Sequence, residues 1–373
     1  MNQGSIVLYT PGHSLYTDTL IMYALAHELR YDPSLVVEGL GTHYRIKAEV
    51  DLDDLVEALS VAYEGIRSEP IERRLRRLLS ERDFAMAEQA LQDTSKLRKY
   101  LHSLEEPGHA RNEGRLGKGS TLKLPLMPTA GKYLHTDLMI KPKYDTKQYK
   151  VCGWCVALGI LGLAYGSLIL SLERHRLAVL FAFEGKVDHE YFGRFFEFMD
   201  SAHLTSEEME SEGQVALNEL RRSLNALPLR SVAYAAVLLL NRELIVTMEG
   251  TKATWKALTA RFDTARAVQV RGYQSLELDA LLSAAADIIR MSEEGSVDAW
   301  SLTRNMVISL IRKARIQDPK ASYALDSLGR LLDFLVERRP ELLYYFARNG
   351  YRAFNRRLSA VNLCKALFEL ICP

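Results

Sequence analysis

The segment VCGWCVALGILGLAYGSLILSL, residues 151–172, decides whether this chain is interpreted as a membrane protein or as a globular one. It carries no charge over 22 residues, and a helix of that length can span the hydrocarbon core of a bilayer. It also contains four glycines, two cysteines and two serines, and the chain has no second segment of this kind. We therefore predict a buried helix over residues 151–172. A membrane-associated helical scaffold anchored by the same residues is one alternative.

Downstream of this segment the pattern changes from strand to helix. LAVLFAFEG (177–185) predicts a buried strand, and residues 187–200 predict a helix. Residues 205–225 open with Thr-Ser-Glu-Glu, the spacing of a capping box, and predict a second helix. The apolar runs within residues 232–250 predict the last strands. From about residue 252 to the end we expect helices that form an antiparallel bundle.

Upstream of the segment, strands and helices alternate. SIVLYT (5–10) predicts a short buried strand, and apolar residues at helical spacing from Leu20 to Leu29 predict a helix. Residues 43–52 alternate between polar and apolar, which is typical of a half-buried strand. Asp51 then stands where an N-cap would open the next helix. Residues 70–104 predict a long, charged helix or helix pair.

The predicted fold class is therefore α+β. We expect an N-terminal mixed α/β body with short antiparallel strands, followed by an all-helical C-terminal bundle. The expected domains are residues 1–250, which include a basic Gly/Pro-rich region at 107–150, and residues 251–373. A chain of 373 residues has the length of two or three such domains.

Composition limits the class of protein. The formal net charge is +1, so any binding of polyanions must come from local patches rather than from the field of the whole molecule. The first residues lack a basic region followed by an apolar core, so we expect no signal peptide. Four cysteines in a chain of this length indicate free thiols. We therefore expect a cytoplasmic protein.

Residues 107–150 are the first candidate for nucleic-acid contact. They contain nine Lys or Arg against three acidic residues, among many glycines and prolines. Residues 114–121 resemble a phosphate-binding loop, but Gly119 separates Lys118 from Ser120, so the Walker spacing is absent. The alternative is a flexible, solvated loop. The lysines would contact the phosphate backbone and the tyrosines would stack on bases: Lys118, Lys123, Lys132, Lys141 and Lys143, with Tyr133 and Tyr144.

The C-terminal helix is the second candidate. Arg348, Arg352 and Arg356 recur at every fourth position, which places them on one face of a helix. Several aromatic residues are interleaved with them, and a face of arginine and aromatic side chains suits phosphate contact and base stacking. The alternative is a bundle helix with an aromatic core and an arginine rim.

Cys152-Gly-Trp-Cys155 is the tightest constellation in the sequence. Two thiolates at this spacing can bind a tetrahedral metal, but a structural zinc site needs four ligands and the chain has no second CxxC. The fold would have to supply the others, from Cys364 and Cys372 or from His135 and His175. Buried structural thiols, a metal site and a thiol redox pair all stay open at this point.

A metal-dependent nuclease is the competing enzyme hypothesis. It would act through His135, Asp137 and Lys141, but metal-dependent cleavage requires at least two convergent carboxylates, and only Asp137 and Asp145 lie nearby. The motifs GxSxG, HExxH and GxGxxG are absent. We therefore expect a protein that is not an enzyme.

Three segments together resemble a known family. They are Leu8-Tyr-Thr-Pro-Gly12 with Ser14 to Asp18, Leu124-Pro-Leu-Met-Pro128 with Gly131 to Tyr133, and Cys152-Gly-Trp-Cys155 running into Gly162. The chain resembles the large subunit of the archaeal subtype I-A CRISPR effector complex (Cascade) across most of its length.

This resemblance implies a noncatalytic subunit of a ribonucleoprotein complex in antiviral defence. Its partners would be the other Cascade subunits, guide RNA, target DNA and a helicase-nuclease, with no membrane. Base pairing with the guide would read the target, while protein would contact the flanking motif and the backbone. The resemblance implies no cofactor. Some relatives have a fuller cysteine pattern, from which the single CxxC of this chain departs, so zinc at Cys152 and Cys155 is only a weak candidate.

Overall fold

The computed structural model describes residues 4–110, 120–121, 125–128, 150–203, 212–265, 268–295, 297–315, 320–354 and 360–368. The chain divides into two compact units. The first comprises Met1–Ile169, Arg176–Leu204 and Leu258–Tyr273, and the second comprises Leu170–His175, Thr205–Ala257 and Gln274–Pro373. Each unit is therefore assembled from segments that lie far apart in the sequence.

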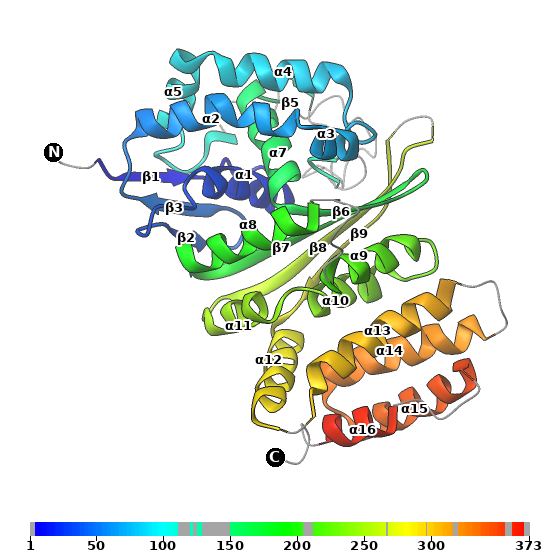
Figure 1. The fold of residues 1–373 in the computed structure, drawn as a ribbon. Helices are drawn as coiled ribbons and strands as arrows, with labels where there is room; N and C mark the ends of the chain where they lie inside the picture. Colours follow the sequence, from blue (N-terminus) through cyan, green and yellow to red (C-terminus); the bar gives the residue numbers. More distant parts are fainter. Residues whose placement is uncertain are drawn as a thin grey trace, which may run out of the picture. The chain divides into compact units, whose positions relative to one another are not determined.

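The main sheet has seven strands in the order β1-β3-β2-β7-β8-β9, with β6 paired to β7 (Figure 1). The strands are β1 (Ile6–Tyr9), β2 (Val36–Gly39), β3 (Tyr44–Ala48), β6 (Ser167–Leu172), β7 (His175–Asp188), β8 (Thr254–Asp263) and β9 (Gln269–Glu277). β1 and β2 both pair antiparallel with β3, and β2 also pairs antiparallel with β7. Residues 177–183 of β7 are all buried, which is why that strand has a continuous apolar run.

The predicted N-terminal elements are confirmed. β1 and β3 form as expected, and α1 (Leu15–Glu28) and α2 (Leu52–Ile66) follow them in the chain. Ser14 caps α1 by accepting a hydrogen bond from the backbone N–H of Thr17, so this helix begins slightly earlier than predicted. The four-residue strand β2 was not predicted, because it is too short to show an alternating pattern.

The segment 151–172 is not a single helix, so that prediction is wrong in its second half. α7 (Gly153–Tyr165) ends at Gly166, and β6 follows directly. α7 packs closely against α1: a Cβ atom on Gly162 would lie only 1.8 Å from the carbonyl oxygen of Leu20. The glycines of this segment therefore permit helix contact inside the protein.

Among the described residues, no single helix is both long enough and apolar enough to cross a membrane. One pair of helices, Leu229–Leu238 with Arg242–Gly250, passes that test of length and composition only when taken together, and the two are bent by 102°.

Two further predictions are wrong. Residues 232–250 form helices α10 (Leu229–Leu238) and α11 (Arg242–Gly250) rather than strands. Residues 252–277, predicted to be helical, contain strands β8 and β9. Periodicity cannot distinguish a short apolar strand from a helix that is buried on every side, and α10 is buried from Val232 to Leu238. The outer strand β9 alternates between exposed and half-buried residues, a signal the sequence did contain.

The charged region 70–104 forms three helices instead of one or two: α3 (Glu69–Leu75), α4 (Glu81–Gln92) and α5 (Thr94–His102). Ser80 and Asp83 form a capping box that opens α4, and Asp93 caps α5. α7 packs between α1 and α4 in the first unit. The predicted helix at 187–200 is confirmed as α8 (His189–His203), whereas the capping box at 205–208 lies outside the described residues.

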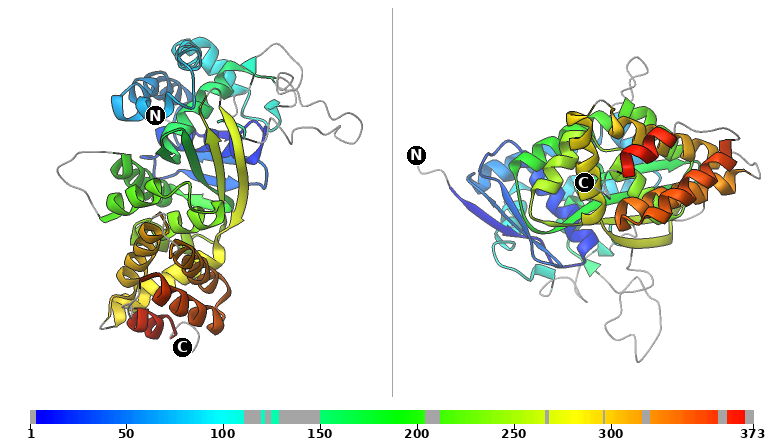
Figure 2. Two further views of the ribbon diagram at one scale, coloured as in Figure 1. Left: turned by 90° about the vertical axis from the view of Figure 1, so that its right-hand side faces the viewer. Right: turned by 90° about the horizontal axis from the view of Figure 1, so that it is seen from below.

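The C-terminal helices pack together, and the α+β fold class is confirmed. They are α9 (Glu212–Arg222), α12 (Asp279–Glu294), α13 (Ala299–Arg315), α14 (Ala321–Glu337), α15 (Pro340–Phe354) and α16 (Ala360–Phe368). Figures 1 and 2 both show α13, α14 and α15 lying side by side. Arg348 and Arg352 of the predicted arginine face lie on α15.

Candidate nucleic-acid interface

α15 is an amphipathic helix whose inner face packs on α14. Its buried residues recur at helical spacing: Leu342, Leu343, Phe346, Asn349, Gly350 and Ala353. The Ser327 hydroxyl of α14 donates a hydrogen bond to the carbonyl oxygen of Phe346 at 2.9 Å, which fixes the register of the two helices. The residues between the buried positions are exposed: Tyr344, Tyr345, Arg348, Tyr351 and Arg352.

Of the two arginines on this face, Arg352 lies over an aromatic ring, and Arg348 is exposed to solvent. The guanidinium of Arg352 lies 5.4 Å from the centre of the Tyr323 ring on α14. Arg330 of α14 lies similarly over Tyr345, at 5.8 Å. Within the part of the chain that the structure describes, neither Arg348 nor Arg352 forms an ion pair with a carboxylate. A cation over an aromatic face keeps its full charge and its N–H donors.

We call this patch the α14/α15 Tyr–Arg surface. It comprises Tyr323, Arg330, Tyr344, Tyr345, Arg348, Tyr351 and Arg352. Tyr344 is 64% exposed and Tyr351 is 55% exposed. Of the six large aromatic residues that are exposed in the described parts of the chain, four belong to this surface. Rings without cover, interleaved with unneutralised guanidinium groups, are the components with which proteins stack bases and contact phosphates.

Asp326 on α14 is a carboxylate that lies beside this surface. The side-chain amide of Asn349 donates a hydrogen bond to it, and the Nε atom of Arg330 lies 3.8 Å from its other oxygen. Asp326 is thus engaged by α14 and α15 themselves. The surface keeps a net positive charge from Arg348 and Arg352.

The remaining predicted contact residues lie outside the part of the chain that the structure describes. They are Lys118, Lys123, Lys132, Tyr133, Lys141, Lys143, Tyr144 and Arg356. The nuclease candidates His135, Asp137 and Lys141 lie there as well. Tyr323 and Arg330 were not predicted, because only the packing of α14 on α15 brings them beside Arg352 and Tyr345.

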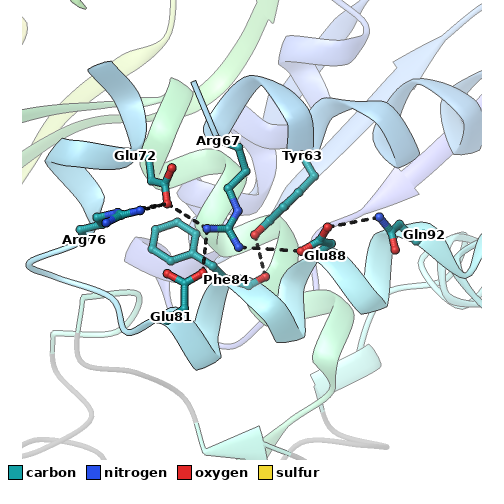
Figure 3. A network of polar contacts seen from close by, with 8 residues as sticks. All are labelled: Tyr63, Arg67, Glu72, Arg76, Glu81, Phe84, Glu88 and Gln92. Atoms are coloured by element: carbon teal, nitrogen blue, oxygen red, sulfur yellow. Dashed lines mark hydrogen bonds and ion pairs between the residues drawn. The ribbon is translucent and has the colours of Figure 1, made fainter. Parts of the chain in front are cut away.

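A second pair of arginines, one on each side of α3, has a different environment (Figure 3). The Nη1 atom of Arg67 donates to Glu72 and to Glu81, both at 2.8 Å, and Nη2 lies 3.8 Å from Glu88. Arg76 shares Glu72, at 3.1 Å from its Nε atom. These guanidinium groups are already neutralised by carboxylates. The network therefore ties α2, α3 and α4 together and is not a surface for phosphate.

A separate cluster forms where α7 begins. Cys152 is the N-cap of α7, directly after the short strand β5 (Lys150–Val151), which pairs with β4 (Ser120–Thr121). The Sγ atom of Cys152 lies 3.3 Å from the Sγ atom of Cys155 and 3.5 Å from Nε2 of His109. The three side-chain donors all lie within 4.8 Å of one another. The residue that joins the two cysteines is therefore His109, which the sequence did not indicate.

The pKa values of the two thiols in this cluster are shifted in opposite directions. The hydrogen bond from the Cys155 thiol, helped by His109 and the Cys155 backbone N–H, outweighs burial and lowers the pKa of Cys152 to about 5. Burial, together with that same shared proton, raises the pKa of Cys155 well above its ordinary value. The Tyr100 hydroxyl lies 3.4 Å from the Cys155 sulfur. One thiolate and one thiol thus share a proton at the helix N-terminus.

Of the other ligands considered from the sequence, Cys372 and His135 lie outside the described residues. Cys364 is a free cysteine on α16, and burial raises its pKa to about 11. Neither Cys364 nor His175 belongs to the group of donors around Cys152.

Comparison with known proteins places the chain among the CRISPR-associated proteins. The model of the family described as CRISPR-associated protein (Cas_Csa4) matches residues 6–372. The chain belongs to this family, and the family resemblance drawn from its motifs is confirmed.

One relative is a protein of Thermoproteus tenax named CRISPR system associated protein Cas8. It is 28% identical over 203 residues. The match covers 47% of this chain and 55% of that protein, so the chain spans about half the length of this curated relative.

Proposed function

We propose that this chain is the noncatalytic large subunit of a CRISPR RNA-guided DNA surveillance complex, the subtype I-A Cascade. It would contact guide RNA and target-flanking DNA and help to recruit the helicase-nuclease. Membership of a CRISPR-associated family supports the setting, and a relative named Cas8 supports the subunit. The observation that carries the proposal is the α14/α15 Tyr–Arg surface, where exposed rings are combined with two arginines, Arg348 and Arg352, that form no ion pair among the described residues.

In this proposal the arginines contact the phosphates of a nucleic-acid strand, and the tyrosines stack on its bases. Arg348 and Arg352 are one helical turn apart, about 6 Å along the axis, so they can contact the same strand. Tyr344 and Tyr345 lie beside them with ring centres 5.6 Å apart in an edge-to-face arrangement. Neither group reads base edges, which agrees with a protein whose sequence recognition is delegated to the guide.

The basic region 107–150 supplies further backbone contacts in this proposal. Its lysines and tyrosines were selected from the sequence and lie outside the described residues. Changing three of them to alanine, Lys132, Lys141 and Lys143, should weaken DNA binding and flatten its salt dependence. If affinity and salt dependence stay unchanged, this region has no part in the interface, whereas the α14/α15 surface is tested separately.

The decisive experiment measures binding of labelled single-stranded DNA by fluorescence anisotropy at several salt concentrations. The double variant Arg348→Ala/Arg352→Ala should bind about tenfold or more weakly at low salt. The slope of log affinity against log salt should fall by about 1.4, because each phosphate contact on a single strand contributes about 0.7. Tyr344→Ala should weaken binding by about 1–3 kcal/mol and leave the salt slope unchanged.

The matched control is Arg290→Ala. It removes one guanidinium from α12, half of what the double variant removes, and Arg290 is already paired with Asp287 at 2.7 Å and with Glu249 at 3.8 Å. It should leave both affinity and slope close to the unmodified protein. An equal loss of binding free energy per arginine removed, in the control and in the double variant, would show that only net charge matters, and the proposed surface would then be rejected.

A further inference from the structure

The donors around Cys152 match a metal site in kind and in spacing. Two sulfur atoms and one imidazole nitrogen are the set that zinc prefers. With zinc at its usual distances, sulfur atoms in a tetrahedral site lie about 3.8 Å apart and sulfur and nitrogen about 3.6 Å apart. The observed separations are 3.3 Å between the two sulfurs and 3.5 Å from Cys152 to His109. These two separations differ from the zinc values by a few tenths of an ångström, and the third, from Cys155 to His109, is within 4.8 Å.

The imidazole of His109 is oriented for this role by Ser103. The Ser103 hydroxyl donates its single proton to the carbonyl oxygen of Tyr100 at 2.6 Å. Its oxygen must therefore accept from Nδ1 of His109, which lies 3.0 Å away. With a metal bound, the proton of His109 would therefore lie on Nδ1, and Nε2 would present its lone pair to the ion. A hydrogen bond that fixes the tautomer of a ligand histidine is a common feature of metal sites.

The sulfur atoms are also held in place. The backbone N–H of Cys155 donates to the Cys152 sulfur at 3.4 Å, so the first turn of α7 fixes the spacing of the two thiols. Trp154 between them is anchored by its indole N–H, which donates to the carbonyl oxygen of Ala90 at 3.0 Å. Its ring stacks on Tyr100, with centres 5.8 Å apart. The cluster is thus set among rigid helices, with positions that packing has already determined.

We propose that His109, Cys152 and Cys155 bind one zinc ion per chain, with a water molecule as the fourth ligand. His109 lies near the start of the basic region 107–150, and Cys152, 43 positions further along the chain, follows its end. The ion would therefore hold together the two ends of residues 110–151, next to the pairing of Ser120 with Val151. Closing a loop of this length with a metal restricts the unfolded chain and supplies folding free energy. A role of this closure in DNA binding rests on the proposed function, but metal binding itself does not.

The test uses the full chain, reduced, stripped with a chelator and titrated with cobalt. One equivalent should give visible d–d bands and the ultraviolet charge-transfer band of thiolate–cobalt bonds, and zinc should displace it. Cys152→Ser, Cys155→Ser and His109→Ala should each weaken cobalt binding by at least about a hundredfold. Ser103→Ala should weaken it by about tenfold, as expected for a residue that positions a ligand. Cys364→Ser is the control and should bind as the unmodified chain does.

Two results would overturn the proposal. One is an unmodified, reduced chain that gives no thiolate–cobalt spectrum, in particular if the protein is isolated with a Cys152–Cys155 disulfide, which would assign the pair to redox chemistry. The other is a spectrum that Cys152→Ser and Cys155→Ser leave intact. His109→Cys keeps a metal-binding donor and should restore the spectrum, which separates loss of a ligand from loss of fold. If the unmodified chain binds cobalt but does not bind DNA, only the proposed function is rejected.

Discussion

Arg67 joins three helices, and its replacement by methionine should destabilise the first unit of the protein. Methionine keeps an unbranched apolar chain but removes the guanidinium that bridges α2, α3 and α4. Tyr63 and Phe84 lie 5.4 and 5.3 Å from that guanidinium, so their rings also lose a cation. Figure 3 shows the carboxylates on either side of it.

The expected loss follows from the exposure of each partner. Glu72 is only 12% exposed, so its hydrogen bond contributes about 1–2 kcal/mol, reduced because Arg76 still pairs with it. Glu81 is 66% exposed, and a contact of that kind contributes less than about 1 kcal/mol. The aromatic contacts add about 0.5–1 kcal/mol. Arg67→Met should therefore lower the free energy of unfolding by about 2–3 kcal/mol.

The measurement is urea denaturation of the full chain, with hydrogen exchange followed in peptides from residues 52–92 so that the local effect is identified. Arg76→Met is the control: Arg76 is 63% exposed and shares Glu72 with Arg67, so its loss should stay below about 0.5 kcal/mol. If Arg67→Met destabilised the protein no more than Arg76→Met, the Arg67 network would contribute no more to the free energy of unfolding than an ordinary surface ion pair.

Two further predictions concern buried positions on and around α1. Burial raises the pKa of Asp18 to about 6, against hydrogen bonds from the backbone N–H groups of Gly12 and Ser14. The folded state therefore binds this proton more tightly than the unfolded state, so its contribution, on the order of 3 kcal/mol, is present below about pH 4 and is lost as the pH rises through 6. In urea titrations, the free energy of unfolding of Asp18→Asn should not fall between pH 4 and pH 6, although the amide can shift it by a constant amount at every pH. If the pH profile of the variant equals that of the unmodified chain, Asp18 does not titrate in this range. Gly162→Ala should cost several kcal/mol in thermal or urea unfolding, because its methyl group would overlap the Leu20 carbonyl. Gly193→Ala in α8, where a Cβ meets nothing within 4 Å, should be neutral or stabilising by up to about 1 kcal/mol, and a similar cost at both glycines would argue against the close packing of α7 on α1.

The sequence predicted elements well where periodicity was clear and failed where burial removed it. α1, α2 and β7 show regular spacing or a bounded apolar run, and each was predicted. α10 and the stretch from α7 into β6 are apolar on every side, so their patterns fit a helix and a strand equally well. Tertiary packing decides between the two, and α7 packs closely against α1 at Gly162.

The candidate sites divide in the same way. Helical spacing alone put Arg348 and Arg352 on one face, because positions four apart lie together on any helix. No local rule could add Tyr323 or Arg330, which reach the surface through the register of α14 on α15. His109 likewise joins Cys152 across 43 positions, and spacing that long has no preferred geometry.

The arginines of this protein include some that are paired with carboxylates and some that lie against aromatic rings, and the two groups differ in how favourably they can bind phosphate. With a net charge of +1, most cations must be offset by nearby acids, and Arg67 is an example, with three carboxylates within 4 Å. Replacing such partners with phosphate would exchange one set of ion pairs for another and gain little free energy. Arg352, held by the Tyr323 ring, has its position fixed without losing its charge, so a phosphate bound there releases counterions and forms new hydrogen bonds. The support of a cation by an aromatic ring instead of a carboxylate is thus the physical feature for which we propose α15, and not α3, as the binding surface.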